Sequence, residues 1–233
     1  MLNSGIFTNY YITGVSKMQV QLITDSACDL PRNIFKEFDI EVVPFNITRK
    51  DQNYKDGLDI KSDELLASME KGGYCYKTAQ INPIQFEKVF EKYVKQNTVC
   101  LYIGFSQEMS GTYQSAEIAK NQLLSEYPKA GIILIDSRTA SISQGIMVLK
   151  IARLIQQGEE LHTLLEEIDR LKQGLKLYFS VDNLDYLYRG GRIGKINNII
   201  GGVLNLKPIL QIEAGKIKPY EKTRGTRRVK NKL

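Results

Sequence analysis

The chain has 233 residues, of which 42% are hydrophobic and 25% are charged. This balance supplies enough apolar surface for one large or two modest cores and argues against intrinsic disorder. No apolar run approaches the roughly 18 residues of a membrane span, and residues 1–17 lack the charged and apolar regions of a signal peptide. The three cysteines lack the spacing of a zinc site or a disulfide framework. We therefore expect a cytoplasmic protein in which residues 1–17 form a mobile extension.

The formal net charge of +6 is concentrated at the C-terminus. Residues 222–233 carry six lysines and arginines and no acidic residue, which leaves 26 basic against 26 acidic residues elsewhere. A neutral body with a short basic end is typical of a solvated tail rather than of a nucleic-acid-binding surface. A regulator that binds nucleic acid through this tail remains an alternative.

Short apolar runs alternate with amphipathic stretches along the first three quarters of the chain. The apolar runs are typical of buried strands and cover residues 19–24, 41–46, 98–103 and 131–135. The amphipathic stretches predict helices over residues 31–38, 62–71, 83–95, 112–127, 142–157 and 161–173. This alternation predicts a parallel-sheet α/β/α domain over residues 18–174. A new strand at 175–181, followed by glycine-rich sequence, predicts a second, smaller α/β domain over residues 175–233.

Polar residues follow the third predicted strand, where it ends at Gly104. Ser110, Gly111 and Thr112 then precede a helix, so we expect them at the carboxyl edge of the sheet, where open α/β sheets bind ligands. Helix N-termini also attract anions. Together with Thr78, they predict a site for a small anionic group. Capping of the helix by Ser110 and Thr112 is the alternative.

Two further clusters extend this hypothesis. Arg189 and Arg192 supply cations within the predicted second domain. Asp25 and Ser26 follow the first strand and are possible residues of the site edge, together with Gly111. Capping of the next helix explains Asp25 and Ser26 equally well.

The sequence gives poor support for catalysis, metal binding or ATP binding. His162 is the only histidine and flanks the apolar stripe of a predicted helix, so a serine nucleophile lacks a base. The acidic residues between 56 and 64 do not match a calcium loop, and the glycines of 190–195 do not match a phosphate-binding loop. We expect no metal, no cofactor and no enzymatic activity. A small serine esterase using Ser26 or Ser110 remains an alternative.

Several motifs, in order and with similar spacing, resemble the DegV family from about Met18 to the C-terminus. The matching segments begin at Ile23-Thr24-Asp25-Ser26 and continue at Tyr54-Lys55-Asp56-Gly57, Thr78-Ala79-Gln80, Ser110-Gly111-Thr112-Tyr113-Gln114, Asp136-Ser137, residues 186–193 and residues 204–210. The resemblance implies a protein that binds one long-chain fatty acid, of about C14 to C18, in an apolar tunnel. It also implies that a separate fatty-acid kinase is the partner.

The resemblance assigns roles to individual residues. Thr78 and Ser110 match the family's carboxylate-binding hydroxyls, with Arg189 or Arg192 nearby. The tunnel lining would draw on Phe45, Ile47, Phe105, Ile142 and residues 199–204. Two departures stand out: Ala79 replaces the serine usual in the family, and the chain stops some 40 to 60 residues before most members do. We therefore expect the second domain to be C-terminally incomplete, with residues 222–233 frayed.

Overall fold

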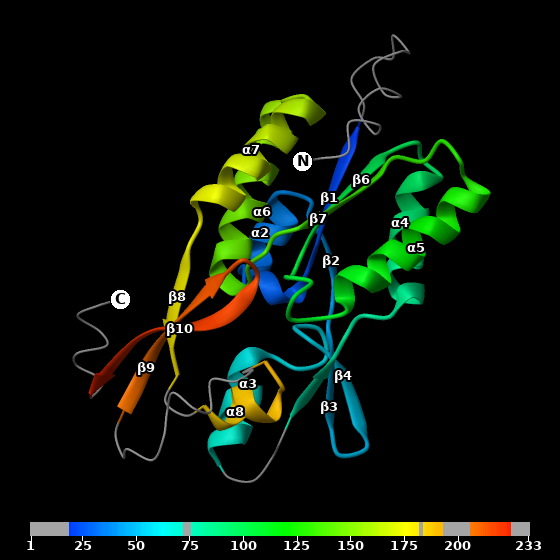
Figure 1. The fold of residues 1–233 in the computed structure, drawn as a ribbon. Helices are drawn as coiled ribbons and strands as arrows, with labels where there is room; N and C mark the ends of the chain where they lie inside the picture. The colour runs from blue at the N-terminus through cyan, green and yellow to red at the C-terminus, as the bar shows by residue number, and fades with distance from the viewer. Residues whose placement is uncertain (1–18, 72–75, 182–183, 193–205, 225–233) are drawn as a thin grey trace.

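A four-stranded parallel sheet forms the centre of the structure, a computed structural model that describes residues 19–71, 76–181, 184–192 and 206–224 (Figure 1). The strands are β1 (Val20–Asp25), β2 (Glu41–Val43), β6 (Val99–Gly104) and β7 (Ile132–Asp136). They lie in the order β2-β1-β6-β7, and every neighbouring pair is parallel. The predicted parallel α/β architecture is confirmed.

Helices cover both faces of this sheet. One face packs against α4 (Pro83–Val94) and α5 (Thr112–Glu126). The other packs against α2 (Arg32–Glu37), α6 (Ser141–Gln157) and α7 (Leu161–Gly174). Since successive strand side chains point to opposite faces, Leu101 belongs to the core under α6 and α7, whereas Tyr102 belongs to the core under α4 and α5.

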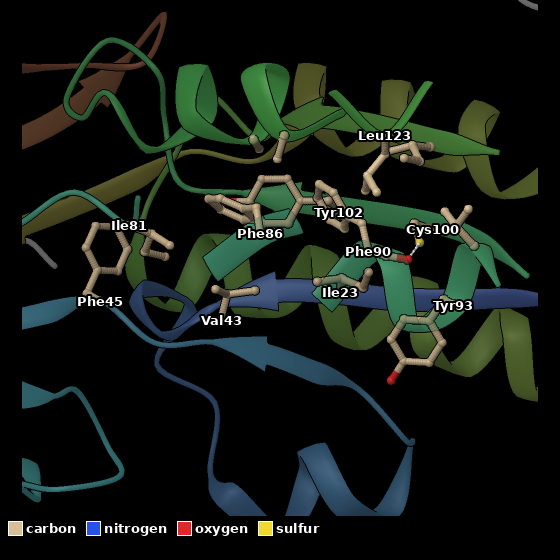
Figure 2. Close-up of a cluster of buried hydrophobic side chains, with 14 residues drawn as sticks. Ile23, Val43, Phe45, Ile81, Phe86, Phe90, Tyr93, Cys100, Tyr102 and Leu123 are labelled. Carbon is tan, nitrogen blue, oxygen red and sulfur yellow. Dashed lines mark hydrogen bonds between the residues drawn. The ribbon is translucent and has the colours of Figure 1, made fainter. Parts of the chain in front are cut away.

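Aromatic side chains dominate the core between the sheet and α4, as Figure 2 shows. Phe86 and Phe90, one helical turn apart, pack against each other with ring centroids 5.6 Å apart. Phe86 also meets Tyr102 edge-on at 5.1 Å, and all three side chains are fully buried. Figure 2 also marks the weak hydrogen bond from the Cys100 thiol to the carbonyl oxygen of Phe90. This packing places Tyr102 with its hydroxyl at the carboxyl edge of the sheet.

A second, antiparallel sheet of three strands was not predicted. It contains β3 (Asn46–Arg49), β4 (Gln52–Lys55) and β5 (Lys77–Ala79) in the order β4-β3-β5, and α3 (Ser62–Glu70) lies between β4 and β5 in the chain. The prediction of one continuous strand over residues 41–46 is wrong, because the chain leaves the central sheet at Pro44–Phe45. Proline cannot donate to a strand ladder.

A third sheet follows α7. Strand β8 (Leu177–Ser180) pairs with β9 (Leu206–Glu213), which pairs with β10 (Lys216–Arg224), all antiparallel. The short helix α8 (Asp185–Arg189) lies between β8 and β9 in the chain. The strand predicted at 175–181 is confirmed, while a domain boundary near residue 174 stays a prediction. Residues 222–224 belong to β10, so the expected fraying of the tail is wrong for these three residues.

Some predictions lie outside the described residues: the extension 1–17, part of the proposed tunnel lining at 199–204, and the tail beyond Arg224. Among the residues that are described, no helix has both the length and the hydropathy of a membrane span.

Candidate functional site

The strand order of the central sheet contains a topological switch point, where a ligand site is expected. From β1 the chain passes to β2 on one side and later to β6 on the other, so the connections diverge between β1 and β6. Open α/β sheets bind ligands at the carboxyl ends of strands at such a switch point. Asp25 ends β1 and Gly104 ends β6, so the loops that follow them form the candidate site.

Asp25 lies beneath this edge and holds the loops together. Its carboxylate accepts hydrogen bonds from the Tyr102 hydroxyl (2.7 Å), the Phe105 amide (2.7 Å), the Gln144 side chain (3.1 Å) and the Ala27 amide (3.2 Å). Desolvation raises the pKa of Asp25, although these donors act in the opposite direction. The side chain is fully buried and its oxygens are engaged, so Asp25 organises the edge rather than facing a ligand. Asp25 does cap a helix, but it is the short 3-10 helix η1 (Ser26–Cys28), through the Ala27 amide. The predicted helix, α2, begins after Pro31 without a side-chain cap, so the capping alternative is wrong for that helix.

Ser26 connects the central sheet to the small sheet. Its Oγ accepts the Phe45 amide hydrogen (3.1 Å) and donates to the carboxylate of Asp56. Burial raises the pKa of Asp56, and the negative charge of Asp29 adds to this effect. Both hydrogen-bonding capacities of Ser26 are therefore used within the protein.

The raised pKa of Asp56 predicts a pH effect on stability. The folded protein retains this proton to higher pH than the unfolded chain, which releases it near the ordinary value of 3.8. Stability should therefore fall as pH rises from 3.8 through the raised pKa. In urea titrations across this range, Asp56→Asn should gain stability relative to the wild type as pH rises. Asp51→Asn, in the exposed turn between β3 and β4, is the control. A constant difference between Asp56→Asn and wild type would contradict the assignment.

Ser110 and Thr112 form a short chain of hydroxyls at the start of α5. The Thr112 Oγ1 accepts the Ile81 amide hydrogen (3.3 Å) and lies 2.9 Å from the Ser110 Oγ. Either hydroxyl can be the donor of this bond. We assign the donor to Thr112, because its fully buried hydroxyl hydrogen has no other acceptor among the described residues. Ser110 also accepts the Thr112 amide hydrogen (3.2 Å). Since Ser110 accepts both hydrogens, its own hydroxyl hydrogen is left to donate to a ligand.

This arrangement separates the roles of the two hydroxyls. Ser110 is half-buried and has a donor to offer, whereas Thr112 is fully buried and supports Ser110. The bond from the Thr112 amide also satisfies one of the free donors of the helix start, so part of the capping alternative is correct for Ser110. Direct ligand binding by Thr112 stays a prediction; its contacts in the structure are with Ile81 and Ser110.

The segment after β5 lies against the same helix start. The Gln80 side chain donates to the Ser115 Oγ at 3.4 Å, and a Cβ at Gly111 would overlap the Gln80 side chain. A larger residue at position 111 would therefore displace the Gln80 side chain from the helix start. Thr78 is exposed and lies two residues before Gln80, which is at most about 7 Å along an extended chain. The structure thus brings together two motifs that are about thirty residues apart in sequence.

The arginines differ in their relation to this site. Arg192 donates from Nε to the carbonyl oxygen of Met109 at 3.2 Å, directly before Ser110. Arg189 is exposed at the end of α8. Of the two predicted cations, Arg192 is the one that a hydrogen bond places beside the loop that follows β6.

The apolar residues expected near the site divide in a similar way. The Phe45 and Phe105 rings pack edge to face with centroids 5.9 Å apart, and Ile47 is buried. Ile142 is 51% exposed on α6. The rings of Phe45 and Phe105 therefore form an apolar contact between the ends of β2 and β6, next to the polar groups.

His162 and the acidic side chains were the other candidates for a reactive centre. His162 is exposed on α7, where its Nδ1 lies 3.3 Å from Glu160. Within the described ranges, no group of three or more His, Cys, Asp and Glu side chains is placed to hold a metal ion. The edge presents the half-buried Ser110 hydroxyl and, beside it, the Arg192 guanidinium, groups that suit the binding of an anion.

Comparison with known proteins gives a consistent result. The model of a family described as uncharacterised proteins of the DegV family matches residues 19–233. A DegV domain-containing protein of Caldanaerobacter subterraneus is 39% identical over 214 residues, which cover 90% of this chain and 73% of that protein.

Solved structures agree in fold. A stearic acid-binding protein from Eubacterium ventriosum superposes with a TM-score of 0.86 at 30% identity, over 91% of this chain and 73% of the other. A fatty-acid-binding DegV family protein from Thermus thermophilus superposes with a TM-score of 0.82 at 31% identity. The match covers 92% of this chain and 75% of the other. The Streptococcus pneumoniae Fatty Acid Kinase (Fak) B3 protein, loaded with linoleic acid, superposes with a TM-score of 0.75 at 26% identity. The match covers 90% of this chain and 74% of the other. The fold and the family model agree, and this chain belongs to the DegV family.

Proposed function

We propose that the protein binds one long-chain fatty acid and holds its carboxylate with Ser110 and Thr78. The observation that carries this proposal is the hydroxyl chain from Ile81 through Thr112 to Ser110. With the buried Thr112 hydroxyl as the donor within this chain, Ser110 keeps its hydrogen for a ligand. The similar stearic acid-binding protein from Eubacterium ventriosum and the linoleic acid-loaded Fak B3 protein from Streptococcus pneumoniae support this ligand class.

The acyl chain and the carboxylate of the ligand should contribute differently to the free energy of binding. Burying about 15 methylene groups contributes on the order of 12 kcal/mol before costs. Ordering the acyl chain and losing its free motion offset several kcal/mol of that. Each hydrogen bond to the charged head group adds about 1.5–3 kcal/mol. Affinity should come mainly from apolar contacts, and orientation from the hydroxyls.

Recognition of the carboxylate can be tested by changing the ligand. Oleate should bind about tenfold more tightly than oleyl alcohol, since hydrogen bonds to a charged acceptor are roughly twice as strong as neutral ones. Competition of both ligands against a fluorescent fatty acid measures the ratio. Equal affinities would contradict a carboxylate site and favour an unspecific apolar one.

A carrier without its own catalysis is the role that we propose for the bound state. The head group would be presented to a separate kinase that phosphorylates the carboxylate, and the likeness to the Fak B3 protein supports this. Incubation of the oleate-loaded protein with ATP should give no acyl phosphate until a fatty-acid kinase subunit is added. Steady hydrolysis of short acyl esters that is lost in Ser110→Ala would instead favour the esterase alternative.

The cytoplasm is the proposed location. Cys28 and Cys100 are buried free thiols, and burial raises the pKa of the Cys28 thiol to about 11 and that of the Cys100 thiol to about 12. Such thiols are unreactive and consistent with a reducing compartment.

A further inference from the structure

The turn between β9 and β10 contacts the loop that leads from β6 to Ser110. The Ser106 hydroxyl donates to the carbonyl oxygen of Gly215 at 2.8 Å, and both residues are buried. In Figure 1 the tip of this hairpin points toward the end of the central sheet. More than one hundred residues separate the two partners in sequence, so this is a long-range contact between the third sheet and the central one.

The geometry of the turn favours glycine at position 215. Gly215 has φ of +82°, a conformation that side chains rarely adopt. A Cβ at this position would lie 2.5 Å from the Ser106 Oγ and 3.1 Å from the Glu108 Cγ. The Ser106 hydroxyl could move away only by giving up its bond to Gly215. Ala214 also has a positive φ, of 50°. The two-residue turn that contacts the β6–α5 loop therefore has a strained backbone.

Three successive parts of the β6–α5 loop are held in this way. Ser106 Oγ accepts the Glu108 amide hydrogen at 3.3 Å while it donates to Gly215. Glu108 forms an ion pair with Lys216 at 3.0 Å. Arg192 then holds the carbonyl oxygen of Met109. The residue that follows Met109 is Ser110, the proposed head-group donor.

We propose that the β9–β10 turn, residues 213–216, is a latch that orders the β6–α5 loop and so positions the Ser110 hydroxyl. Ser106, Gly215 and the Glu108–Lys216 pair are positioning residues, because they act on the ligand only through Ser110. The effect on the ligand rests on the proposed function, whereas the ordering of the loop does not.

The first test measures the latch without any ligand. Amide hydrogen exchange of residues 105–112 should become faster in ligand-free Gly215→Ala and Ser106→Ala than in wild type. Gly57→Ala is the matched control, because Gly57 has a similar φ of +71° but only one atom, at 3.9 Å, near its Cβ position. Unchanged exchange in both latch variants, or an equal increase in Gly57→Ala, would overturn the proposal.

The second test adds oleate. Gly215→Ala should weaken oleate binding by about threefold to tenfold, the range expected when one hydrogen bond is lost. Glu108→Lys and Lys216→Glu should each weaken binding by about twofold, since exposed ion pairs contribute little. The double variant with both charges exchanged should recover wild-type affinity, which general destabilisation would not produce.

The two proposals fail in different ways. A wild-type protein that refuses oleate, while its latch variants still show faster exchange, would contradict the proposed function and leave the latch supported. A wild-type protein that binds oleate with the same affinity and exchange pattern as Gly215→Ala would contradict the latch alone.

Discussion

Asp25→Ala is expected to lower the free energy of unfolding by about 3 kcal/mol. The substitution removes the acceptor of four hydrogen bonds and leaves the fully buried Tyr102 hydroxyl without another acceptor among the described residues. The Gln144 amide loses its shortest bond and keeps two longer ones, to the Thr24 hydroxyl and the Ile103 carbonyl oxygen. Unsatisfied buried donors carry their desolvation cost without compensation. Urea titration monitored by circular dichroism measures the change.

Tyr102→Phe is the matched control for this prediction. It removes one donor and leaves Asp25 with three, so it should cost about 1 kcal/mol. If Asp25→Ala cost no more than Tyr102→Phe, the carboxylate would not be the common support of the loops at the carboxyl edge.

Ser110→Ala is expected to weaken oleate binding by about 10-fold to 100-fold, the factor for one hydrogen bond to a charged group. Thr112→Val should have a similar effect, because it removes the donor that directs the Ser110 hydrogen outward. The double variant should be little worse than either single one, since both act on the same bond. Equilibrium binding of oleate to folded protein measures all three.

Thr112→Ser is the control that keeps the hydroxyl and removes only a methyl group. It should bind oleate nearly as wild type does. Additive losses in Ser110→Ala and Thr112→Val, or a loss in Thr112→Ser as large as in Thr112→Val, would show that the hydroxyl chain does not operate as described.

Elements with a strong local signal could be predicted from the sequence. The strand at 98–103 is a continuous apolar run, and the helix at 161–173 has a clear apolar stripe. Both were found within one or two residues of the expected limits, as β6 and α7. The small sheet was missed because its strands are short and largely polar, and because β5 is fully exposed at the edge. Such strands form through long-range pairing rather than through local preference.

In the candidate site, too, some features could be predicted from the sequence and others depend on long-range contacts. The sequence indicated Ser110 and Thr78 through position and resemblance. It could not distinguish the hydroxyl that donates to the ligand, Ser110, from the hydroxyl that positions it, Thr112. That distinction depends on the burial of Thr112 and on the Ile81 amide, which come together only in the folded chain. The contact of Gly215 with Ser106 joins segments more than one hundred residues apart and left only a weak signal, the Ala-Gly pair between two strands.

Mass spectrometry of the purified protein, first under native conditions and then after organic extraction, would show whether it carries a fatty acid. We expect one fatty acid of about C14 to C18 per chain, released intact on extraction and exchangeable with added oleate. A protein that carries no acyl chain and does not take up added oleate would contradict this expectation.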